Sequence, residues 1–116
     1  LKKFEKYFVL PAWEKEAEPS WFGFLLTVKE DAPFDRDRLV QHLQENNIAT
    51  RYLFAGNITK QPYFIDNPIQ YRVVGELKNT DLIMSNTFWV GVYPGLNAEM
   101  IDYVVACFDK FLQEYI

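Results

Sequence analysis

Three short apolar runs constrain the fold of this chain most. They cover residues 21–28, 48–54 and 87–93, and in each of them aromatic and β-branched side chains recur at every second position. Because a period of two places alternate side chains on the same face of a strand, the runs predict three β-strands. All are far shorter than the roughly 20 apolar residues that a spanning helix needs, so no membrane segment is expected.

Helical patterns lie between and after these strands. Asp35 is placed to cap a helix that ends near Asn46, and Asn97 is placed to cap a long final helix. A shorter helix is predicted over residues 81–85. The expected buried stripes consist of Leu39, Val40 and Leu43 in the first helix and of Ile101, Val104, Val105, Phe108 and Leu112 in the last.

This order of elements predicts an α+β fold. The first two strands are joined through a helix and should run parallel by the usual right-handed crossover. The third strand can enter antiparallel, between the first two. We therefore expect a small mixed or mostly antiparallel three-stranded sheet with helices on one face.

The first twenty residues differ from the remainder. Residues 1–8 carry apolar side chains at helical spacing, which predicts the end of a helix that Pro11 would stop. Residues 11–20 contain two prolines and three glutamates, as in an exposed connector. Because the chain starts at Leu1 and not at Met, we expect residues 1–20 to be a helix tail and connector from a missing N-terminal domain, and 21–116 to be a C-terminal small domain.

Composition narrows the class of protein. The 116 residues are 49% hydrophobic and 17% aromatic, and 12 basic against 16 acidic residues give a net charge of −4. This balance argues against binding to nucleic acid or to acidic membranes, where clustered lysines and arginines supply the attraction. A single cysteine, Cys107, excludes an internal disulfide, and a cytoplasmic location fits best.

The sequence contains no self-sufficient active site. Motifs for phosphate loops, dinucleotides, serine hydrolases and zinc proteases are absent. His42 has no second histidine to share a metal, and Cys107 is expected to fill apolar space in the core. The acidic pairs at 30–31 and 35–37 fall in a turn or at a helix start, where acidic side chains interact favourably with the helix dipole. We therefore predict no catalytic residue and no metal ligand in this chain.

The segment 50–64, TRYLFAGNITKQPYF, is the candidate for binding. It combines an arginine, a lysine and an asparagine that follows a glycine with four aromatic side chains. Such a set can hold a sugar or nucleotide by stacking and by charge-assisted hydrogen bonds. A strand end whose aromatics only fill the core explains the composition equally well.

The same segment carries a resemblance to a known family. The chain resembles the C-terminal part of the DegT/DnrJ/EryC1/StrS sugar aminotransferases over about residues 7–113, and is most similar to their CDP-4-keto-6-deoxyglucose 3-dehydrase branch. The matching segments are TR at 50–51, FAGN at 54–57, QPYF at 61–64, YRVVGEL at 71–77 and TFWVGVYPGL at 87–96. Aminotransferases of the family usually carry a histidine before Q-P, and its absence here favours the dehydrase branch.

The resemblance implies a fold-type I pyridoxal-phosphate enzyme in which this small domain closes over the active site. A dehydrase of this type uses pyridoxamine or pyridoxal phosphate and a [2Fe-2S] cluster, and acts on a CDP-linked 4-keto-6-deoxyhexose with electrons from a flavin/iron-sulfur reductase. It belongs to deoxysugar and lipopolysaccharide O-antigen biosynthesis and works as a homodimer. The cofactor and cluster are expected in the missing N-terminal domain, which leaves the isolated fragment inactive and without cofactor.

The resemblance also indicates which residues face substrate or cofactor. These are Arg51, Phe54, Gly56 and Asn57, with Lys60 and Tyr63 as weaker candidates. Leu82 stands where an arginine is expected in the pattern N-T-D-R, so the bound sugar nucleotide can differ from that of relatives.

Two other functions stay open. One is a domain of a sugar-nucleotide aminotransferase, which a lysine in the missing domain would support. The other is a freestanding ligand-binding module, whose surface would lack an orphaned apolar patch. If the large domain is missing, Trp21 and Trp89 are candidates for the exposed apolar surface, unless the sheet is covered on both faces.

Overall fold

The computed structural model describes residues 1–115. Four strands form one sheet in the order β1-β2-β4-β3, and every neighbouring pair is antiparallel. The strands are β1 (Phe8–Val9), β2 (Gly23–Val28), β3 (Thr50–Tyr52) and β4 (Thr87–Gly91). The helices are α1 (Arg36–Glu45), α2 (Pro62–Asp66), α3 (Lys78–Asn86) and α4 (Ala98–Leu112), with short 3₁₀ turns η1 (Lys2–Phe4), η2 (Ile58–Lys60) and η3 (Gln113–Tyr115).

The predicted α+β class and strand order are confirmed. β4 lies between β2 and β3 and pairs antiparallel with both, so β2 and β3 run parallel to each other across it. Phe88 on β4 stands opposite Leu26 on one side and opposite Tyr52 on the other. The sheet differs from the expectation by one added strand, the two-residue β1 at its edge.

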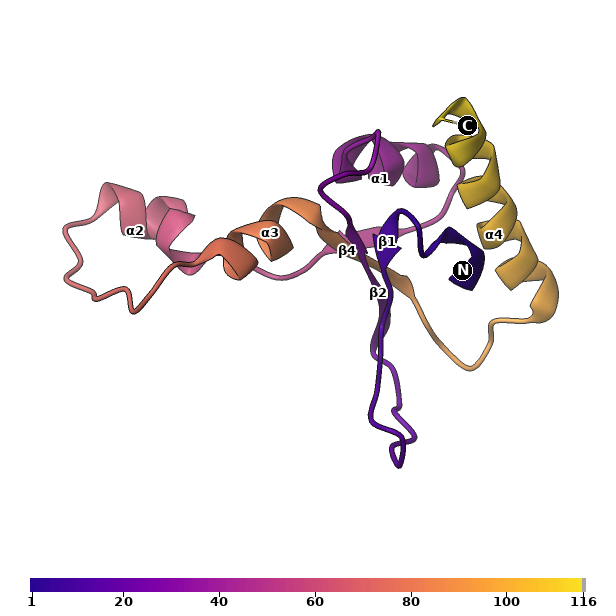
Figure 1. The fold of residues 1–116 in the computed structure, drawn as a ribbon, viewed down its shortest axis with the longest axis horizontal. Helices are drawn as coiled ribbons and strands as arrows, with labels where there is room; N and C mark the ends of the chain where they lie inside the picture. Colours follow the sequence, from indigo (N-terminus) through magenta and orange to yellow (C-terminus); the bar gives the residue numbers. More distant parts are fainter. Residues whose placement is uncertain (116) are drawn as a thin grey trace.

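The core lies between one face of the sheet and the helices α1 and α4. Figure 1 shows these two helices on one side of the molecule and α2 and α3 on the other. Leu26 and Phe88 from the sheet are fully buried together with Leu39, Leu43 and Phe108 from these helices. Both predicted caps are present: Asp35 accepts a hydrogen bond from the Arg38 amide at 2.8 Å, and Asn97 from the Met100 amide at 2.9 Å. Of the predicted stripe of α4, Ile101 is half exposed, whereas Phe108 and Leu112 are buried.

The helix predicted over residues 1–8 is wrong. A single 3₁₀ turn is followed by β1, which pairs with the end of β2 so that Phe8 stands opposite Val28. Phe4, Tyr7 and Phe8 are buried in the main core, where the Phe8 ring lies edge-on to that of Phe108 at 5.9 Å. Phe4 and Phe8 pack against Phe108 of α4, and Tyr7 packs against Phe34, so these residues form part of the same core as the later elements.

Residues 53–86, which we call the arm, leave the sheet after β3 and return to it at β4. Figure 1 shows α3, in orange, and α2, in pink, reaching away from the sheet. The radius of gyration is 16.5 Å, against about 13 Å for a compact domain of this length. No apolar side chain between Ile48 and Phe88 is buried in the described structure. The arm therefore has no apolar core of its own.

The predicted connector 11–20 forms the loop between β1 and β2, which Figure 1 shows as a second projection. Within it Trp13 lies edge-on to Trp21 at 5.9 Å. Trp21 and Trp89, predicted as candidates for an exposed apolar surface, are both half-buried. The strongly exposed aromatics are instead Phe22 and Phe54, at 80% and 79%.

Candidate functional site

The candidate site begins on the face of the sheet opposite α1 and α4. Alternation along the strands places Leu25, Trp89 and Arg51 in one row across this face, since Trp89 stands opposite Leu25 on β2 and opposite Arg51 on β3. Arg51 is exposed, and its guanidinium donates one hydrogen bond, to the Thr50 carbonyl at 3.1 Å. Because the side chain is exposed, its guanidinium can also bind an anionic ligand.

Trp89 is the centre of an aromatic cluster on this face. Phe22 lies edge-on to it at 5.3 Å and Phe54 does the same at 5.2 Å. Gly23 makes room for the indole, because a Cβ at that position would come within 3.1 Å of it. The two phenylalanine rings and the indole form an apolar edge beside Arg51, as suits an apolar sugar face or a planar base.

The chain turns sharply as it leaves β3. Phe54 has φ +45° and Gly56 has φ +62°, so two residues in three adopt the left-handed conformation. This turn holds the Phe54 ring over Trp89 and brings Gly56 against α3. A Cβ on Gly56 would lie 2.5 Å from Cγ of Met84, which explains why this position suits glycine.

Asn57 is 2% exposed and fixes the start of the arm. Its Oδ1 accepts hydrogen bonds from the amide and the hydroxyl of Thr59, at 3.0 and 2.7 Å. Its Nδ2 donates to Oδ1 of Asp81 at 2.7 Å, and its amide donates to the Met84 sulfur at 3.4 Å. Asn57 therefore joins the loop to α3, and its side chain is directed inward.

Lys60 reaches the same carboxylate. Its Nζ lies 2.8 Å from Oδ1 of Asp81, and both side chains are about half exposed. The hydrogen bond from Lys60, followed by that from Asn57, holds the pKa of Asp81 below its ordinary value. Lys60 is therefore partly neutralised and contributes less charge to a ligand than Arg51 does.

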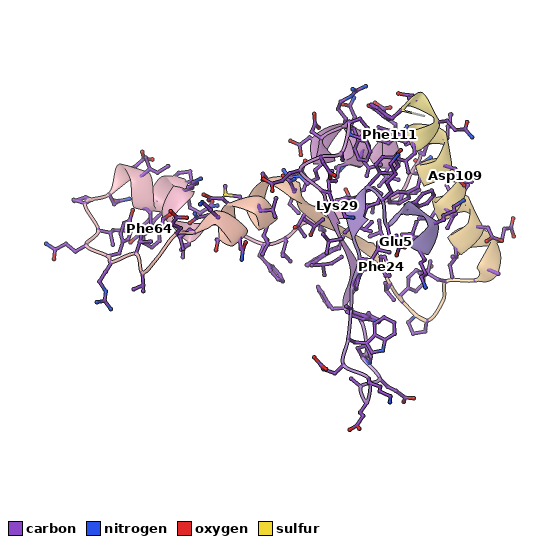
Figure 2. The ribbon with its side chains drawn as sticks, viewed as in Figure 1. Glu5, Phe24, Lys29, Phe64, Asp109 and Phe111 are labelled. Carbon is purple, nitrogen blue, oxygen red and sulfur yellow. The ribbon has the colours of Figure 1, made fainter. Side chains whose placement is uncertain are left out.

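Tyr63 is the one predicted site residue that the structure places apart. It is 68% exposed on α2, beyond η2, and its ring contacts that of Phe64 at 5.9 Å. Figure 2 labels Phe64 far out on the arm, well away from Phe111 in the main core. The structure thus brings together Arg51 and Phe54 at the sheet, and Gly56, Asn57 and Lys60 at α3, whereas Tyr63 lies outside both groups.

Sequence reasoning missed several residues of this neighbourhood. Trp89 and Phe22 belong to the aromatic cluster, and Asp81 and Met84 hold the loop from α3. The strand alternation contains a signal for Trp89, because it puts that residue on the same face as Arg51. The contacts of Asp81 and Met84 depend on the path of the arm, which no local pattern indicates.

The other residues considered from the sequence have structural roles. The Nε2 of His42 lies 3.1 Å from the Cys107 carbonyl, and its ring packs on Phe111. Cys107 is buried, as expected for an apolar filler. Within residues 1–115 no group of three or more His, Cys, Asp and Glu side chains is placed to share a metal ion. Of the helices in this part of the chain, none has the length and apolar character needed to cross a bilayer.

Comparison with known proteins decides the family. The model of the DegT/DnrJ/EryC1/StrS aminotransferase family matches residues 1–109. The chain belongs to this family. The predicted resemblance is thereby confirmed, and the α+β domain with its antiparallel sheet is a DegT/DnrJ/EryC1/StrS domain.

Two curated relatives are named for lipopolysaccharide biosynthesis and for a sugar-nucleotide 3-dehydratase. The chain is 50% identical over 111 residues to the lipopolysaccharide biosynthesis protein RfbH of Salmonella typhimurium, covering 96% of this chain and 25% of that protein. It is 47% identical over 104 residues to the dTDP-4-dehydro-2,6-dideoxy-D-glucose 3-dehydratase of Saccharopolyspora spinosa, covering 90% of this chain and 22% of that enzyme. The chain therefore spans about a quarter of the length of these relatives.

A solved structure has the same fold. The GDP-4-keto-6-deoxy-D-mannose-3-dehydratase of E. coli, with hydrated PLP bound, superposes with a TM-score of 0.75 at 27% identity, over 91% of this chain and 27% of that one. In the present chain the candidate site offers one exposed guanidinium and an aromatic edge, and Lys60 is paired with Asp81. These groups fit the sugar or phosphate side of a substrate and do not by themselves make a pocket for a pyridine ring and its phosphate.

Proposed function

We propose that this chain is the C-terminal small domain of a pyridoxal- or pyridoxamine-phosphate-dependent sugar-nucleotide 3-dehydratase that acts in deoxysugar biosynthesis, including that of lipopolysaccharide. The observation that carries the proposal is the match to the family together with relatives named as 3-dehydratases of nucleotide-linked keto-deoxysugars. The cofactor supplies the electron sink for loss of the C3 hydroxyl group. It is bound by a larger N-terminal domain that precedes these residues.

The role of this domain is to bind and enclose the substrate. Arg51 supplies an exposed cation for a phosphate, and Phe54 with Trp89 supplies an apolar edge for the sugar or base. Gly56 and Asn57 place these groups by anchoring the turn on α3. Lys60 is a secondary cation, and Tyr63 contacts the larger domain or substrate from α2.

The arm supports the presence of a partner surface. Its exposed apolar side chains include Phe54, Ile58, Tyr63, Ile65 and Val74. So many apolar groups outside a core are typical of a surface that another part of the protein covers. We assign that cover to the N-terminal cofactor domain and, in the homodimer, to the neighbouring subunit.

The proposal also specifies the nucleotide of the substrate and the source of electrons. We propose a CDP-linked 4-keto-6-deoxyglucose, with a [2Fe-2S] cluster in the full-length protein and a flavin/iron-sulfur reductase as electron donor. The relatives named above act on dTDP- and GDP-linked sugars, which shows that this family accepts different nucleotides. Leu82 lies on α3 and is half-buried, so in this protein its position supplies no cation to a substrate.

The test uses the complete reading frame. The purified protein is examined for a pyridoxal or pyridoxamine absorbance band and for bound iron, and is then incubated with the CDP-, dTDP- and GDP-linked 4-keto-6-deoxyhexoses. Loss of the C3 hydroxyl with the CDP sugar supports the proposal. An aminosugar product with glutamate as donor identifies an aminotransferase instead, and turnover of only dTDP or GDP sugars overturns the nucleotide assignment.

A matched pair of variants tests the site. Arg51→Met removes the exposed cation beside Trp89, whereas Arg38→Met removes an exposed arginine from α1 on the other side of the sheet. We expect Arg51→Met to raise KM for the sugar nucleotide about tenfold, as loss of one charge-assisted hydrogen bond would, and Arg38→Met to leave it unchanged. Equal KM values for the two variants would remove Arg51 from the site.

A further inference from the structure

Arg36 at the start of α1 contacts three separate parts of the chain. Its side chain is only 10% exposed, although arginine is rarely buried unless it is paired. Nη1 donates to the Met84 carbonyl at 2.6 Å and to the Thr87 carbonyl at 3.4 Å. These carbonyls flank the junction between α3 and β4, where the arm returns to the sheet.

The same guanidinium also stacks on the ring of Tyr52, at the other end of the arm. Its central carbon lies 3.9 Å from the centre of the Tyr52 ring, and Tyr52 is the last residue of β3, where the arm begins. Nε of Arg36 donates to Oδ1 of Asp37 at 2.9 Å, and the Tyr52 hydroxyl donates to the same oxygen at 3.0 Å. Arg36 therefore joins the two ends of the arm to each other and to α1.

The charge state of this network is fixed at neutral pH. Burial raises the pKa of Asp37, but hydrogen bonds from Arg36 and from Tyr52 outweigh it and leave that pKa below its ordinary value. Burial, followed by the hydrogen bond to Asp37, raises the pKa of Tyr52. The carboxylate is thus ionised and the phenol neutral, which is the state that these hydrogen bonds require.

Met84 connects this network to the candidate site. Its carbonyl accepts from Arg36, its side chain packs on Gly56, and its sulfur accepts from the Asn57 amide. At the other end of the arm, Tyr52 ends β3 and is separated from Phe54 by one residue. The site has two walls, one formed by Arg51 and Phe54 and the other by α3. A displacement of Arg36 would consequently move both walls, although no atom of Arg36 is among the groups that we assign to substrate.

We propose that Arg36 is a positioning residue that sets the distance between the Arg51–Phe54 wall and the α3 wall of the substrate site. The planar shape of the guanidinium suits this role, because its face can stack on Tyr52 while Nη1 at its edge donates to two backbone carbonyls. The catalytic consequence rests on the proposed function, whereas the effect on the placement of the arm does not.

The experiment compares Arg36→Met, Arg36→Lys and the control Arg38→Met in the full-length protein. Hydrogen exchange measured by mass spectrometry reports on residues 53–60 and 78–86 independently of activity. We expect exchange in both segments to rise at least tenfold in Arg36→Met, with α4 unchanged. Arg36→Lys retains a charge for the Met84 carbonyl but loses the planar stack, and we expect an intermediate rise.

Kinetics then test the connection to substrate. We expect Arg36→Met to raise KM for the sugar nucleotide about tenfold with cofactor absorbance unchanged, and Arg36→Lys to recover part of this loss. Unchanged exchange in the two segments, or a uniform rise that includes α4, would overturn the proposal. If exchange rises as expected in a protein without dehydratase activity, the positioning role stands and the proposed function fails. If Arg36→Met does not fold, the exchange and KM of Arg36→Lys decide.

Discussion

Gly56 and Met84 are in direct contact, and a Cβ added to Gly56 would lie 2.5 Å from Cγ of Met84. This contact joins the turn after β3 to α3, two segments that are far apart in sequence. A larger residue at position 56 would push the turn, and Phe54 with it, away from α3.

Substitution of Gly56 by alanine should therefore loosen the arm. The left-handed φ of +62° and the contact with Met84 both penalise a side chain, with an expected cost of about 2–4 kcal/mol. Hydrogen exchange of residues 78–86 measures it. Gly75→Ala is the matched control, because Gly75 has φ +74° and open space around it. Equal effects of the two substitutions would show that the contact with Met84 contributes nothing.

Asn57→Ala should open the start of the arm. The substitution leaves the Thr59 amide without its acceptor and removes the hydrogen bond to Asp81, at a cost of about 1–3 kcal/mol for a buried polar network. The opening free energy of residues 57–60, obtained from hydrogen exchange, measures this cost. Asn67→Ala is the control, since Asn67 is exposed and its side chain donates to the Tyr63 carbonyl, which also lies in the arm. A protection in Asn57→Ala equal to that of the wild type would contradict the assignment.

Acid should weaken the contribution of Asp81 to the stability of the arm. Because hydrogen bonds from Lys60 and Asn57 lower the folded pKa of Asp81, the stability it contributes is fully present above its unfolded value of about 3.9 and is lost as pH falls through the folded pKa. The stability difference between wild type and Asp81→Asn should thus shrink as the pH falls below the unfolded pKa and disappear below the folded pKa of Asp81. Thermal unfolding followed from pH 7 to pH 3 measures it. A difference that is independent of pH would exclude ionised Asp81 as its source.

Phe54→Ala should affect substrate affinity far more than stability. Phe54 is 79% exposed, so we expect a stability change within about 0.5 kcal/mol. Loss of an aromatic contact with the ligand is worth about 0.5–1.5 kcal/mol, which corresponds to a rise in KM of roughly two- to tenfold. Steady-state kinetics of the full-length enzyme measure it. Ile101→Ala, at a half-exposed position on α4, is the control, and the same KM in both variants would argue against a binding role for Phe54.

Phe8→Ala should destabilise the whole domain. Phe8 is 2% exposed and packs on Phe34 and Phe108, and truncation of such a ring costs about 3–5 kcal/mol. Val9→Ala, next to it but 56% exposed, should cost less than about 0.5 kcal/mol. Urea unfolding followed by tryptophan fluorescence compares them. A cost for Phe8→Ala below 1 kcal/mol would mean that β1 does not belong to the core.

The sequence allowed the main elements to be predicted because their signals are local. Asp35 and Asn97 cap α1 and α4 as expected, and the alternation in residues 21–28 and 87–93 marks β2 and β4. The resemblance pointed to Arg51, Phe54 and Asn57, and the structure places them at one end of the arm. Their contact with substrate stays a prediction.

The errors came from contacts between distant residues. Leu1, Phe4 and Tyr7 have helical spacing, but Phe8 pairs with Val28 and packs against α4, so the segment ends as a strand. The helix over residues 62–66 was not predicted at all, because five residues carry too short a pattern to recognise.

The sequence by itself determined the α+β class, the caps and the faces of the strands, since these follow from side chains a few residues apart. The tertiary structure decided which residues meet across the fold. Only there does Met84 pack on Gly56, and only there does Arg36 stack on Tyr52 while binding the carbonyl of Met84. Such contacts depend on how the chain closes long loops, and neither propensity nor periodicity reports this.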